Sequence, residues 1–600
     1  MTLPALFRER ARASAARVAL REKRDGIWRE HTWAEYAERV RAFGLGLVAL
    51  GVERGDRVAI HSEDRPEWLF ADIGTMSVGA ISVGIYPTNP PAEVEYLLSH
   101  SGARVVVAED QEQVDKALAV ADRCPALERI VYVDPKGLRG YRDARLVPYV
   151  EVERLGRALH EEDPARFDRL VDERTPDEIA TIVYTSGTTA APKGAMLTQA
   201  NLAEAIRVSG LLWRASEDDR ICSYLPLCHV AEKLFTTYLP IAFGASANFA
   251  ESIDTVTANL REVEPTIFLG VPRIWEKMAA GVQIRMQDAD PVKRAVFRLW
   301  TRIGGRLADV WIRSGGRYPW PWKAVYALGW LLLYRSLQNK LGLARCHTPV
   351  SGAAPISPDV LRFFHAIGIH VREAWGLTEC VGAATLTRGE SVRIGSVGPP
   401  IPGMEARIAN DGEILLRSTL VFAGYYRDPE GTAEAVDADG WLHTGDVGFI
   451  DEAGHVHITD RKKDLMITAG GKNIAPSLIE NKLKASPLIK EAIAIGDRRR
   501  YVAALIGIER DAVGDWATRR GIAFTTYRDL TERPEVIELI AGEVRRANRD
   551  LALVEQVTKF RLIPKELDHE DGELTATQKV KRAILQERFR DLVETLYRSA

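Results

Sequence analysis

Cysteine is scarce in this sequence, and its spacing fits neither a zinc site nor a disulfide framework. Five cysteines occur among 600 residues, and no two of them form a C-x-x-C pair. Structural zinc and a scaffold of disulfides are therefore excluded as the basis of the fold. We expect a reduced, cytoplasmic chain.

Long apolar runs are absent as well. The first twenty residues contain no uninterrupted apolar stretch of the secretory type. The most hydrophobic run, AVYALGWLLLY at residues 324–334, is shorter than the roughly 20 residues that span a bilayer. Two interpretations stay open for it: peripheral contact with a membrane surface, for which its flanking aromatic residues are suited, or the edge of a buried helix.

Neither sign of charge is in large excess. The chain has 80 lysines and arginines against 83 aspartates and glutamates, so its net charge is −3. No broad basic surface is expected from these numbers, and we predict no nucleic-acid partner.

What the sequence does contain is an alternation of short β-branched runs and helical stretches. Strands are predicted at residues 56–62, 103–109, 128–134 and 179–186, and helices at 65–78 and 112–122. Short buried strands separated by helices indicate a layered α/β fold with mainly parallel sheets.

The pattern changes near Asp446, where turn residues join hairpin-like segments. Beyond a charged run, ITDRKKDL, come two strand-like stretches, IKEAIAIGD and YVAALIGIERD, followed by helical segments and VTKFRLIP. This predicts a large domain at 1–459 and a compact α+β domain at 460–600, with a hinge near Asp460. An ordinary salt-bridged hairpin edge is the alternative for the charged run.

The stretch VYTSGTTAAPKGAMLT, residues 183–198, combines small and hydroxyl side chains with one lysine, Lys193. Unhindered N–H and O–H groups can converge on phosphate oxygens. The stretch fails the P-loop pattern G-x-x-x-x-G-K-[ST], because Pro192 replaces the second glycine and Gly194 follows the lysine. It is either a phosphate loop of another kind or a solvated polar turn.

Three further stretches bear on this choice: REAWGLTEC (372–380), GWLHTGDVG (440–448) and GELTATQKVKR (572–582). Each alone is typical of a helix start, a turn or a solvated face. In this order, and together with LPLCHVAEK, VSGAAPIS, GSVGPPIPG, GYY and DRKKDLMITAGGKNIAP, they resemble the adenylate-forming superfamily of acyl-CoA synthetases, luciferases and peptide-synthetase adenylation domains. The resemblance covers nearly the whole chain and is greatest to long-chain fatty acyl-CoA synthetases.

The resemblance implies a fold and a reaction. The large N-terminal domain would combine mainly parallel sheets with a β-barrel-like subdomain, and the small C-terminal α+β domain would be mobile. A fatty acid and ATP would give acyl-AMP and pyrophosphate, after which coenzyme A displaces AMP, with Mg²⁺ as the metal. Homodimers occur among relatives, so a homodimer is an expectation by analogy.

The resemblance also assigns residues to the nucleotide. The phosphates would be contacted by Thr185, Ser186, Gly187, Thr188, Thr189, Lys193 and Thr378, the adenine by Gly352, Ala353, Ala354, Trp375 and Gly376, and the ribose by Asp446. Arg461 would be a second contact to the ribose or to a phosphate. Thr185 and Glu379 would hold Mg²⁺, for which oxygen ligands are suited. The catalytic lysine would be Lys579, with the neighbouring Lys581 as the alternative.

For the other two substrates the resemblance implies fewer residues. His229, Gly270, Val271 and Gly352 would line the acyl site, where the glycines leave depth for a chain. Gly470 and Gly471 would leave room for the pantetheine arm of coenzyme A.

Two alternatives remain at this point. An adenylating enzyme could pass its acyl-AMP to a carrier protein, or a degenerate nucleotide-binding protein could act as a scaffold at membranes. The second is motivated by Ala190, which stands where the family pattern S-G-T-T-G-x-P-K-G has glycine. If that position requires a positive φ, alanine costs roughly 1–2 kcal/mol.

Overall fold

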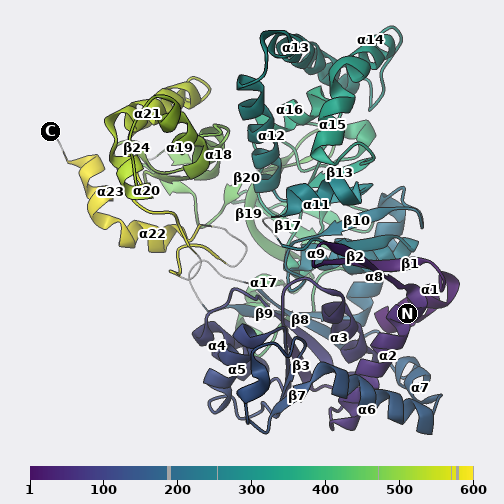
Figure 1. Ribbon diagram of the computed structural model, residues 1–600. Coiled ribbons are helices and arrows are strands. Elements are labelled where there is room, and N and C mark those ends of the chain that lie inside the picture. Colours follow the sequence, from purple (N-terminus) through teal and green to yellow (C-terminus); the bar gives the residue numbers. More distant parts are fainter. Residues whose placement is uncertain (186–190, 253–254, 471, 569–570, 576–579, 599–600) are drawn as a thin grey trace.

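The fold consists of two large sheets, a smaller antiparallel sheet and a separate C-terminal unit (Figure 1). The computed structural model describes residues 1–600 except 186–190, 253–254, 471, 569–570, 576–579 and 599–600. The N-terminus lies in the large part, and the chain ends beyond the helices of the C-terminal unit.

The first large sheet has the strand order β15-β14-β13-β12-β10-β11-β1-β2, and its six central strands run parallel. Only the edge strands β2 and β15 pair antiparallel. The strands are β1 (Val18–Arg24), β2 (Ile27–Thr32), β10 (Arg220–Ser223), β11 (Ser246–Phe249), β12 (Ile267–Gly270), β13 (Thr348–Ser351), β14 (Arg372–Trp375) and β15 (Thr385–Leu386).

The second large sheet has the order β18-β9-β8-β4-β3-β5-β6-β7 and is parallel from β8 to β7. Strands β8 and β9 form a hairpin, and β18 extends its edge. The strands are β3 (Arg57–His61), β4 (Ile81–Ile85), β5 (Val105–Ala108), β6 (Arg129–Tyr132), β7 (Leu146–Pro148), β8 (Ile179–Thr185), β9 (Lys193–Thr198) and β18 (Gly424–Tyr425).

Side-chain alternation along these strands decides which helices cover each face. Val58 and Ile60 of β3 face a core shared with helix α3 and the first sheet, whereas Ala59 faces α4 and α5. Eleven of the twelve residues of α3 are buried, as expected of a helix between two sheets. The helices of this region are α1 (Leu3–Ala13), α2 (Trp33–Ala49), α3 (Pro66–Ser77), α4 (Pro91–Ser101), α5 (Gln111–Ala121), α6 (Tyr149–Glu162), α7 (Arg166–Asp172), α8 (Gln199–Leu212), α9 (Val230–Lys233), η2 (Leu234–Tyr238) and α10 (Leu239–Phe243).

A second core joins the outer face of the first sheet to a helical layer. In it Trp275 packs between Phe268 and Phe364, with ring centroids 5.4 and 4.8 Å away. The layer comprises α11 (Val256–Val263), α12 (Pro272–Gln287), α13 (Pro291–Arg313), α14 (Trp322–Gly329), η3 (Trp330–Tyr334), α15 (Arg335–Leu341) and α16 (Pro358–Ala366).

The third sheet has four antiparallel strands in the order β16-β17-β19-β20. It takes the place of the β-barrel-like subdomain that the resemblance implies. Its strands are β16 (Glu405–Ile408), β17 (Glu413–Arg417), β19 (Leu442–Ile450) and β20 (Val456–Arg461), and α17 (Pro429–Ala435) precedes β19. The hairpin predicted near Asp446 is the β19–β20 pair.

The C-terminal unit is α+β. A three-stranded sheet in the order β23-β24-β25 carries helices, and a two-stranded ribbon, β21-β22, precedes it. The elements are β21 (Met466–Ile467), β22 (Asn473–Ile474), α18 (Pro476–Lys484), β23 (Ile489–Ile495), β24 (Val502–Ile508), α19 (Arg510–Arg519), α20 (Tyr527–Glu532), α21 (Pro534–Asn548), β25 (Val557–Leu562), α22 (Arg582–Arg588) and α23 (Arg590–Tyr597).

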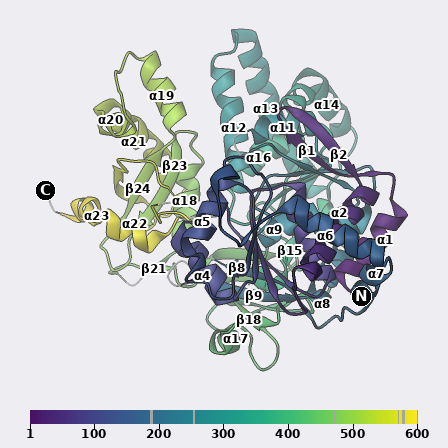
Figure 2. The same cartoon turned by 60° about the horizontal axis from the view of Figure 1, so that its bottom comes forward.

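Ion pairs attach this unit to the helical layer of the large part, beside which it lies in Figures 1 and 2. Arg519 of α19 forms a two-pronged pair with Asp288 at 2.6 and 2.8 Å, and Arg273 of α12 pairs with Glu509. Exposed pairs of this kind each contribute little to stability. The contact is therefore of the polar type that allows two domains to separate.

The cysteines and the apolar run at 324–334 can now be placed in the structure. All five cysteines are free, and four of them are buried. Within the described parts of the chain, no helix combines the length and the apolar character that crossing a bilayer requires. The run 324–334 forms the end of α14 and the π-helical turn η3, and Leu331 and Leu332 are 67% and 51% exposed.

Candidate active site

The hairpin β8–β9 brings Thr185 and Lys193 together at the start of the candidate phosphate loop. The two residues are register partners, and the Thr185 hydroxyl donates to the Lys193 carbonyl at 3.4 Å. Ser186, Gly187, Thr188, Thr189 and Ala190, which complete the predicted loop, lie outside the described residues.

The Lys193 ammonium group reaches two partners on the neighbouring chain segment. It forms an ion pair with Asp428 Oδ2 at 2.9 Å and lies 4.9 Å from the centre of the Tyr425 ring. The hydrogen bond from Lys193 holds the pKa of Asp428 below its usual range. Since Lys193 is 42% exposed, its charge remains accessible to a ligand.

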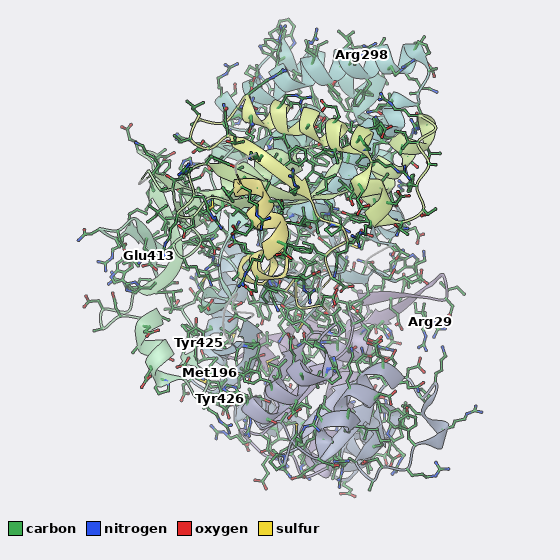
Figure 3. The ribbon with its side chains drawn as sticks, turned by 90° about the vertical axis from the view of Figure 1, so that its left-hand side faces the viewer. Arg29, Met196, Arg298, Glu413, Tyr425 and Tyr426 are labelled. Carbon is green, nitrogen blue, oxygen red and sulfur yellow. The ribbon has the colours of Figure 1, made fainter. Side chains whose placement is uncertain are left out.

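Tyr425 connects this lysine to Glu379. Strand β18 pairs with β9 so that Tyr425 stands opposite Ala195, and its hydroxyl donates to Glu379 Oε1 at 2.6 Å. Burial, and then the charge of Glu379, raise the pKa of Tyr425, so the phenol stays protonated and keeps donating. Figure 3 shows Tyr425 beside Met196 and Tyr426 at this edge of the sheet.

Glu379 belongs to the short 3₁₀ turn η4 (Thr378–Cys380), which is separated from the end of β14 by two residues. Its backbone carbonyl accepts a hydrogen bond from Phe422 N at 2.9 Å. The predicted phosphate contact Thr378 is the first residue of the same turn. Thr378 and Glu379 are therefore fixed to the segment that carries Tyr425.

Asp446 is the centre of a second cluster. It is 4% exposed, and its two carboxylate oxygens have different partners: Oδ2 accepts from the Trp375 indole N–H at 2.8 Å, and Oδ1 forms an ion pair with Arg461 Nε at 2.8 Å. Asp446 and Arg461 are register partners on β19 and β20, whereas Trp375 ends β14 of the first large sheet. Three predicted nucleotide contacts thus meet at one carboxylate.

The two clusters lie close enough to influence one another. The positive charge of Arg461 acts on Tyr425 and partly offsets the rise in the pKa of that phenol. Trp375 and Glu379 are also four residues apart on one short segment. Together the clusters present cations and oriented donors in the way that a polyanionic ligand requires.

The parallel strands β12, β13 and β14 end side by side at Gly270, Ser351 and Trp375, which is where open α/β sheets bind ligands. Gly352 follows β13, and Ala353 and Ala354 after it are exposed. Ala353 has a φ of 67°, a conformation that a side chain rarely adopts. A Cβ on Gly376 would approach the Gly382 carbonyl to 2.5 Å, so glycine is required there.

The expected depth at Gly270 is filled by a neighbouring ring. A Cβ at this position would lie 2.5 Å from Trp275 Nε1, and that indole donates to the Gly270 carbonyl at 2.9 Å. The absence of a side chain at Gly270 therefore accommodates Trp275 rather than leaving an open channel. Val271, next along the chain, donates its backbone N–H to the Tyr224 hydroxyl at 3.1 Å and precedes α12.

His229 lies at the start of α9, where its Nδ1 accepts from Ala231 N at 3.2 Å. This orientation makes the imidazole a helix cap. Its side chain is half-buried.

The predicted residues of the C-terminal unit are described only in part. Lys579 and Gly471 lie outside the described residues. Lys581 immediately precedes α22 and donates its backbone N–H to the Glu573 carbonyl at 2.9 Å, and Gly470 is exposed in the turn before β22. For neither Lys581 nor Gly470 is a contact with the clusters around Asp446 and Glu379 described.

The predicted hinge lies where β20 leaves the four-stranded sheet. Asp460 is 8% exposed and accepts from Ser477 N of the C-terminal unit at 3.0 Å. Lys462 pairs with Asp411 at 2.6 Å and with Glu413 at 3.0 Å, and Figure 3 shows Glu413 on this sheet. Asp460 thus contacts the C-terminal unit, and Lys462, which follows it, contacts the large part.

Two residues that complete the first cluster were not singled out from the sequence. Tyr425 stands in the motif GYY, which contributed to the resemblance only as a pattern, and Asp428 follows it by three residues. Their neighbourhood is also hollowed: Met196, Phe422, Tyr425, Asp428 and Thr432 line a cavity of ≈ 550 Å³. Since neither Trp375 nor Asp446 lines that cavity, we do not assign the nucleotide to it.

Comparison with known proteins identifies relatives over the full chain. A long-chain-fatty-acid–CoA ligase, FadD15 of Mycobacterium bovis, is 36% identical over 581 residues, covering 96% of this chain and 93% of the relative. The long-chain-fatty-acid–CoA ligase ACSBG2 of Xenopus laevis is 31% identical over 632 residues, covering 100% of this chain and 84% of the relative.

Solved structures confirm the fold. The adenylation domain of a carboxylate reductase from Mycobacterium chelonae superposes with a TM-score of 0.75 at 20% identity, over 100% of this chain and 91% of that one. An anthranilate CoA ligase in complex with anthranoyl-AMP gives 0.72 at 19% identity, over 99% and 98%.

Two family models divide the chain between them. Residues 7–426 match the AMP-binding enzyme family, and residues 463–600 match the AMP-binding enzyme C-terminal domain. The first match alone spans more than half of the chain and includes the hairpin with Lys193 as well as Trp375, Glu379 and Tyr425. The chain belongs to the AMP-binding enzyme family.

Proposed function

We propose that this protein activates a long-chain fatty acid with ATP and transfers it to coenzyme A. The observation that carries the proposal is the joint cluster around Asp446 and Glu379, in a chain 31–36% identical to long-chain-fatty-acid–CoA ligases over nearly its full length. In the first step a carboxylate oxygen attacks the α-phosphorus and pyrophosphate leaves. In the second the coenzyme A thiol attacks the acyl carbon and AMP leaves.

The first step brings a carboxylate towards a polyanion. Two unit charges 4 Å apart repel by roughly 4 kcal/mol at an effective dielectric constant of 20. Lys193 and the N–H and O–H groups of Thr185, Ser186, Gly187, Thr188 and Thr189 hold the β- and γ-phosphates, and Thr378 contacts the α-phosphate. Lys579 stabilises the charge that develops between the attacking carboxylate and the α-phosphate.

The ribose binds at Asp446. Asp446 is placed by Trp375 and Arg461, each 2.8 Å from one of its carboxylate oxygens. A carboxylate with two acceptor oxygens suits the two hydroxyls of a cis-diol. Trp375 then presents its ring to the adenine, with Gly352, Ala353, Ala354 and Gly376 as small neighbours.

Mg²⁺ fits this site as an ion shared with the nucleotide. Among the described residues no group of three or more histidine, cysteine, aspartate or glutamate side chains could hold a metal. Glu379 and Thr185 supply oxygen atoms, and Mg²⁺ commonly binds one or two protein oxygens together with substrate phosphates and water. Its chemistry here is to neutralise phosphate charge.

The acyl chain is proposed to enter past His229 and Gly352 towards Val271 and Gly270. Trp275 occupies the space beside Gly270, so this indole forms a wall of the acyl site. Each methylene buried against such walls contributes about 0.8 kcal/mol, which favours long chains.

The protein is divided into a domain at 1–459 and a domain at 460–600, with a hinge near Asp460. The C-terminal domain rotates about this hinge between the two steps, so both steps use the same site. Lys579 serves adenylation. After the turn, Gly470 and Gly471 face the site and leave room for the pantetheine arm. The polar contact between Arg519 and Asp288 is of a kind that such a motion can break.

For the setting of the reaction we propose the cytoplasm, with peripheral contact to a membrane surface where the fatty acid is dissolved. A homodimer stays a prediction by analogy with relatives.

The test is substrate-dependent exchange of pyrophosphate into ATP, followed by AMP release with palmitate and coenzyme A. We expect exchange with palmitate and AMP release only when coenzyme A is present. Acyl-AMP that accumulates without thioester would identify a carrier-protein adenylating enzyme instead. No exchange with any fatty acid from C8 to C20 would contradict an enzymatic function.

A further inference from the structure

The segment from α13 to α15 differs in charge from the rest of the molecule. Residues 291–345 contain eleven lysines and arginines and a single acidic residue, Asp309. In the whole chain acidic residues slightly outnumber basic ones, 83 to 80. One strongly basic region is thus concentrated within 55 residues of an otherwise balanced protein.

Helix α13 arranges part of this charge as a stripe. Arg294, Arg298, Arg302 and Arg306 follow one another at intervals of four, which places them along one face of the helix. All four are exposed, and no ion pair is described for any of them within the residues that the structure covers. The opposite face carries Trp300, Leu307 and Trp311, which are buried.

Large apolar side chains are exposed on the stretch from Trp320 to Leu332, whose helices pack against α13. Trp320 is 84% exposed, Leu331 67%, and Leu328 and Leu332 51% each. Trp322 and Trp330, at 38% each, belong to the same short stretch. Single exposed apolar residues are ordinary, but several within one patch indicate a surface that another body covers.

The patch is firmly attached to the fold rather than being a loose end. The Tyr334 hydroxyl donates to the Trp300 carbonyl at 2.9 Å, and a Cβ on Gly329 would lie 2.9 Å from the Trp300 ring. These contacts hold α14 and η3 against α13. Figures 1 and 2 show α13 and α14 together at one end of the large part.

Charge and composition identify the occupant. Arginines favour anionic headgroups, tryptophan rings favour the boundary between headgroups and acyl chains, and leucines favour the acyl chains. A second copy of the chain would bring two unpaired arginine stripes together in a symmetric contact, which is unfavourable. We propose that α13 and the stretch from Trp320 to Leu332 form a docking surface for a bilayer with anionic lipid headgroups.

The surface lies over the second core, which also contains Phe268 of β12 and Trp275 of α12. A bilayer docked there would lie next to the helical layer that borders the proposed acyl site. The inference rests on the peripheral membrane contact in the proposed function and assigns it to particular residues, which take no part in either chemical step. Its failure would therefore leave the exchange reaction as it is.

The test is co-sedimentation with vesicles of phosphatidylcholine alone and of phosphatidylcholine mixed with phosphatidylglycerol. We expect binding to the mixed vesicles that weakens as salt is added. The double variant Arg298→Glu/Arg302→Glu should bind at least about tenfold more weakly. Its matched control is the double variant Arg29→Glu/Arg139→Glu. Both of these arginines are exposed, have no described ion pair and lie outside the stripe. Figure 3 shows Arg29 far from Arg298.

A second pair of variants tests the apolar part. Trp320→Ser/Leu331→Ser should weaken binding several-fold at low and at high salt, whereas Leu211→Ser/Leu553→Ser, which replaces side chains 61% and 84% exposed elsewhere, should not. Exchange activity with fatty acid supplied in detergent should be unchanged in all four variants, which shows that they fold. Equal binding of all variants, no binding to either vesicle, or a dimer in solution that the α13 variants dissolve would each overturn the proposal.

Discussion

The arginines of α13 and the cations around Asp446 and Glu379 carry the same charge in opposite surroundings. Arg461 is paired with a buried carboxylate and Lys193 with Asp428, whereas Arg298 and its neighbours on α13 are exposed with no ion pair described for them. The paired cations have fixed positions, as a small ligand with defined geometry requires. The unpaired ones can adapt to a surface whose headgroups move. Side chains that pair across distant segments therefore indicate chemistry, and exposed side chains of one sign along a single helix indicate docking.

The largest effect that separates the two regions is expected from Lys579→Ala. Loss of this cation should lower ATP–pyrophosphate exchange by about 10²–10³-fold, the range found when one transition-state donor is removed. Thioester formation from supplied acyl-AMP and binding to vesicles should both be retained. Lys581→Ala is the matched control. If Lys581→Ala abolishes exchange and Lys579→Ala does not, the catalytic lysine is the second of the two.

Asp446→Asn and Trp375→Phe probe the paired cluster without touching the surface. Asp446→Asn removes the charge of the acceptor and Trp375→Phe removes the N–H donor, so we expect the KM for ATP to rise about tenfold or more for Asp446→Asn and by less for Trp375→Phe. Trp28→Phe is a suitable control, because the Trp28 indole also donates to a carboxylate, Glu262, at 2.9 Å. An ATP KM that rises as much in Trp28→Phe would mean that Trp375 acts only through general stability.

Tyr425→Phe removes the hydroxyl that orients Glu379 while it keeps the ring under Lys193. We expect a loss of roughly three- to tenfold in kcat/KM, in line with one hydrogen bond to a charged group, and a higher Mg²⁺ concentration for half-maximal rate. Tyr426→Phe, on the same edge of the sheet, should leave both quantities unchanged. An unchanged Mg²⁺ requirement in Tyr425→Phe would remove Glu379 from the metal site.

The smallest effect concerns Glu373, two residues before Trp375 on β14. Burial raises the pKa of Glu373 from 4.5 to about 8, so between these values the folded protein holds a proton that the unfolded chain releases. Stability contributed by this group is therefore lost as the pH rises from 4.5 to 8. The variant Glu373→Gln does not have this loss. The Tm of the variant minus the Tm of the wild-type protein should therefore be a few degrees larger at pH 8 than at pH 5. The same Tm difference at both pH values would contradict this.

Local patterns in the sequence predicted the elements whose residues pack on both faces. The runs at 56–62, 103–109 and 179–186 correspond to β3, β5 and β8, and the helix at 65–78 corresponds to α3. Their side chains are apolar because they lie between layers, so alternation and length are sufficient. The pairing of Asp446 with Arg461 follows from the β19–β20 hairpin, which turn residues also indicate.

Contacts between distant segments could not be obtained in this way. The bond from Tyr425 to Glu379 depends on the register of β18 on β9, and that register is set by tertiary packing. The filling of the space at Gly270 by Trp275 depends on how α12 leaves β12, which a single glycine in the sequence does not reveal. For 324–334, the apolar run was visible in the sequence, but which of its side chains face solvent depends on the contact of Tyr334 with α13.

The measurement that bears most directly on the proposed activity is ATP–pyrophosphate exchange across fatty acids of increasing length. The account predicts exchange that depends on the fatty acid, is strongest with long chains, and is lost in Lys579→Ala while Arg298→Glu/Arg302→Glu retains it. Exchange that is absent with every fatty acid, or that proceeds equally without one, would contradict it.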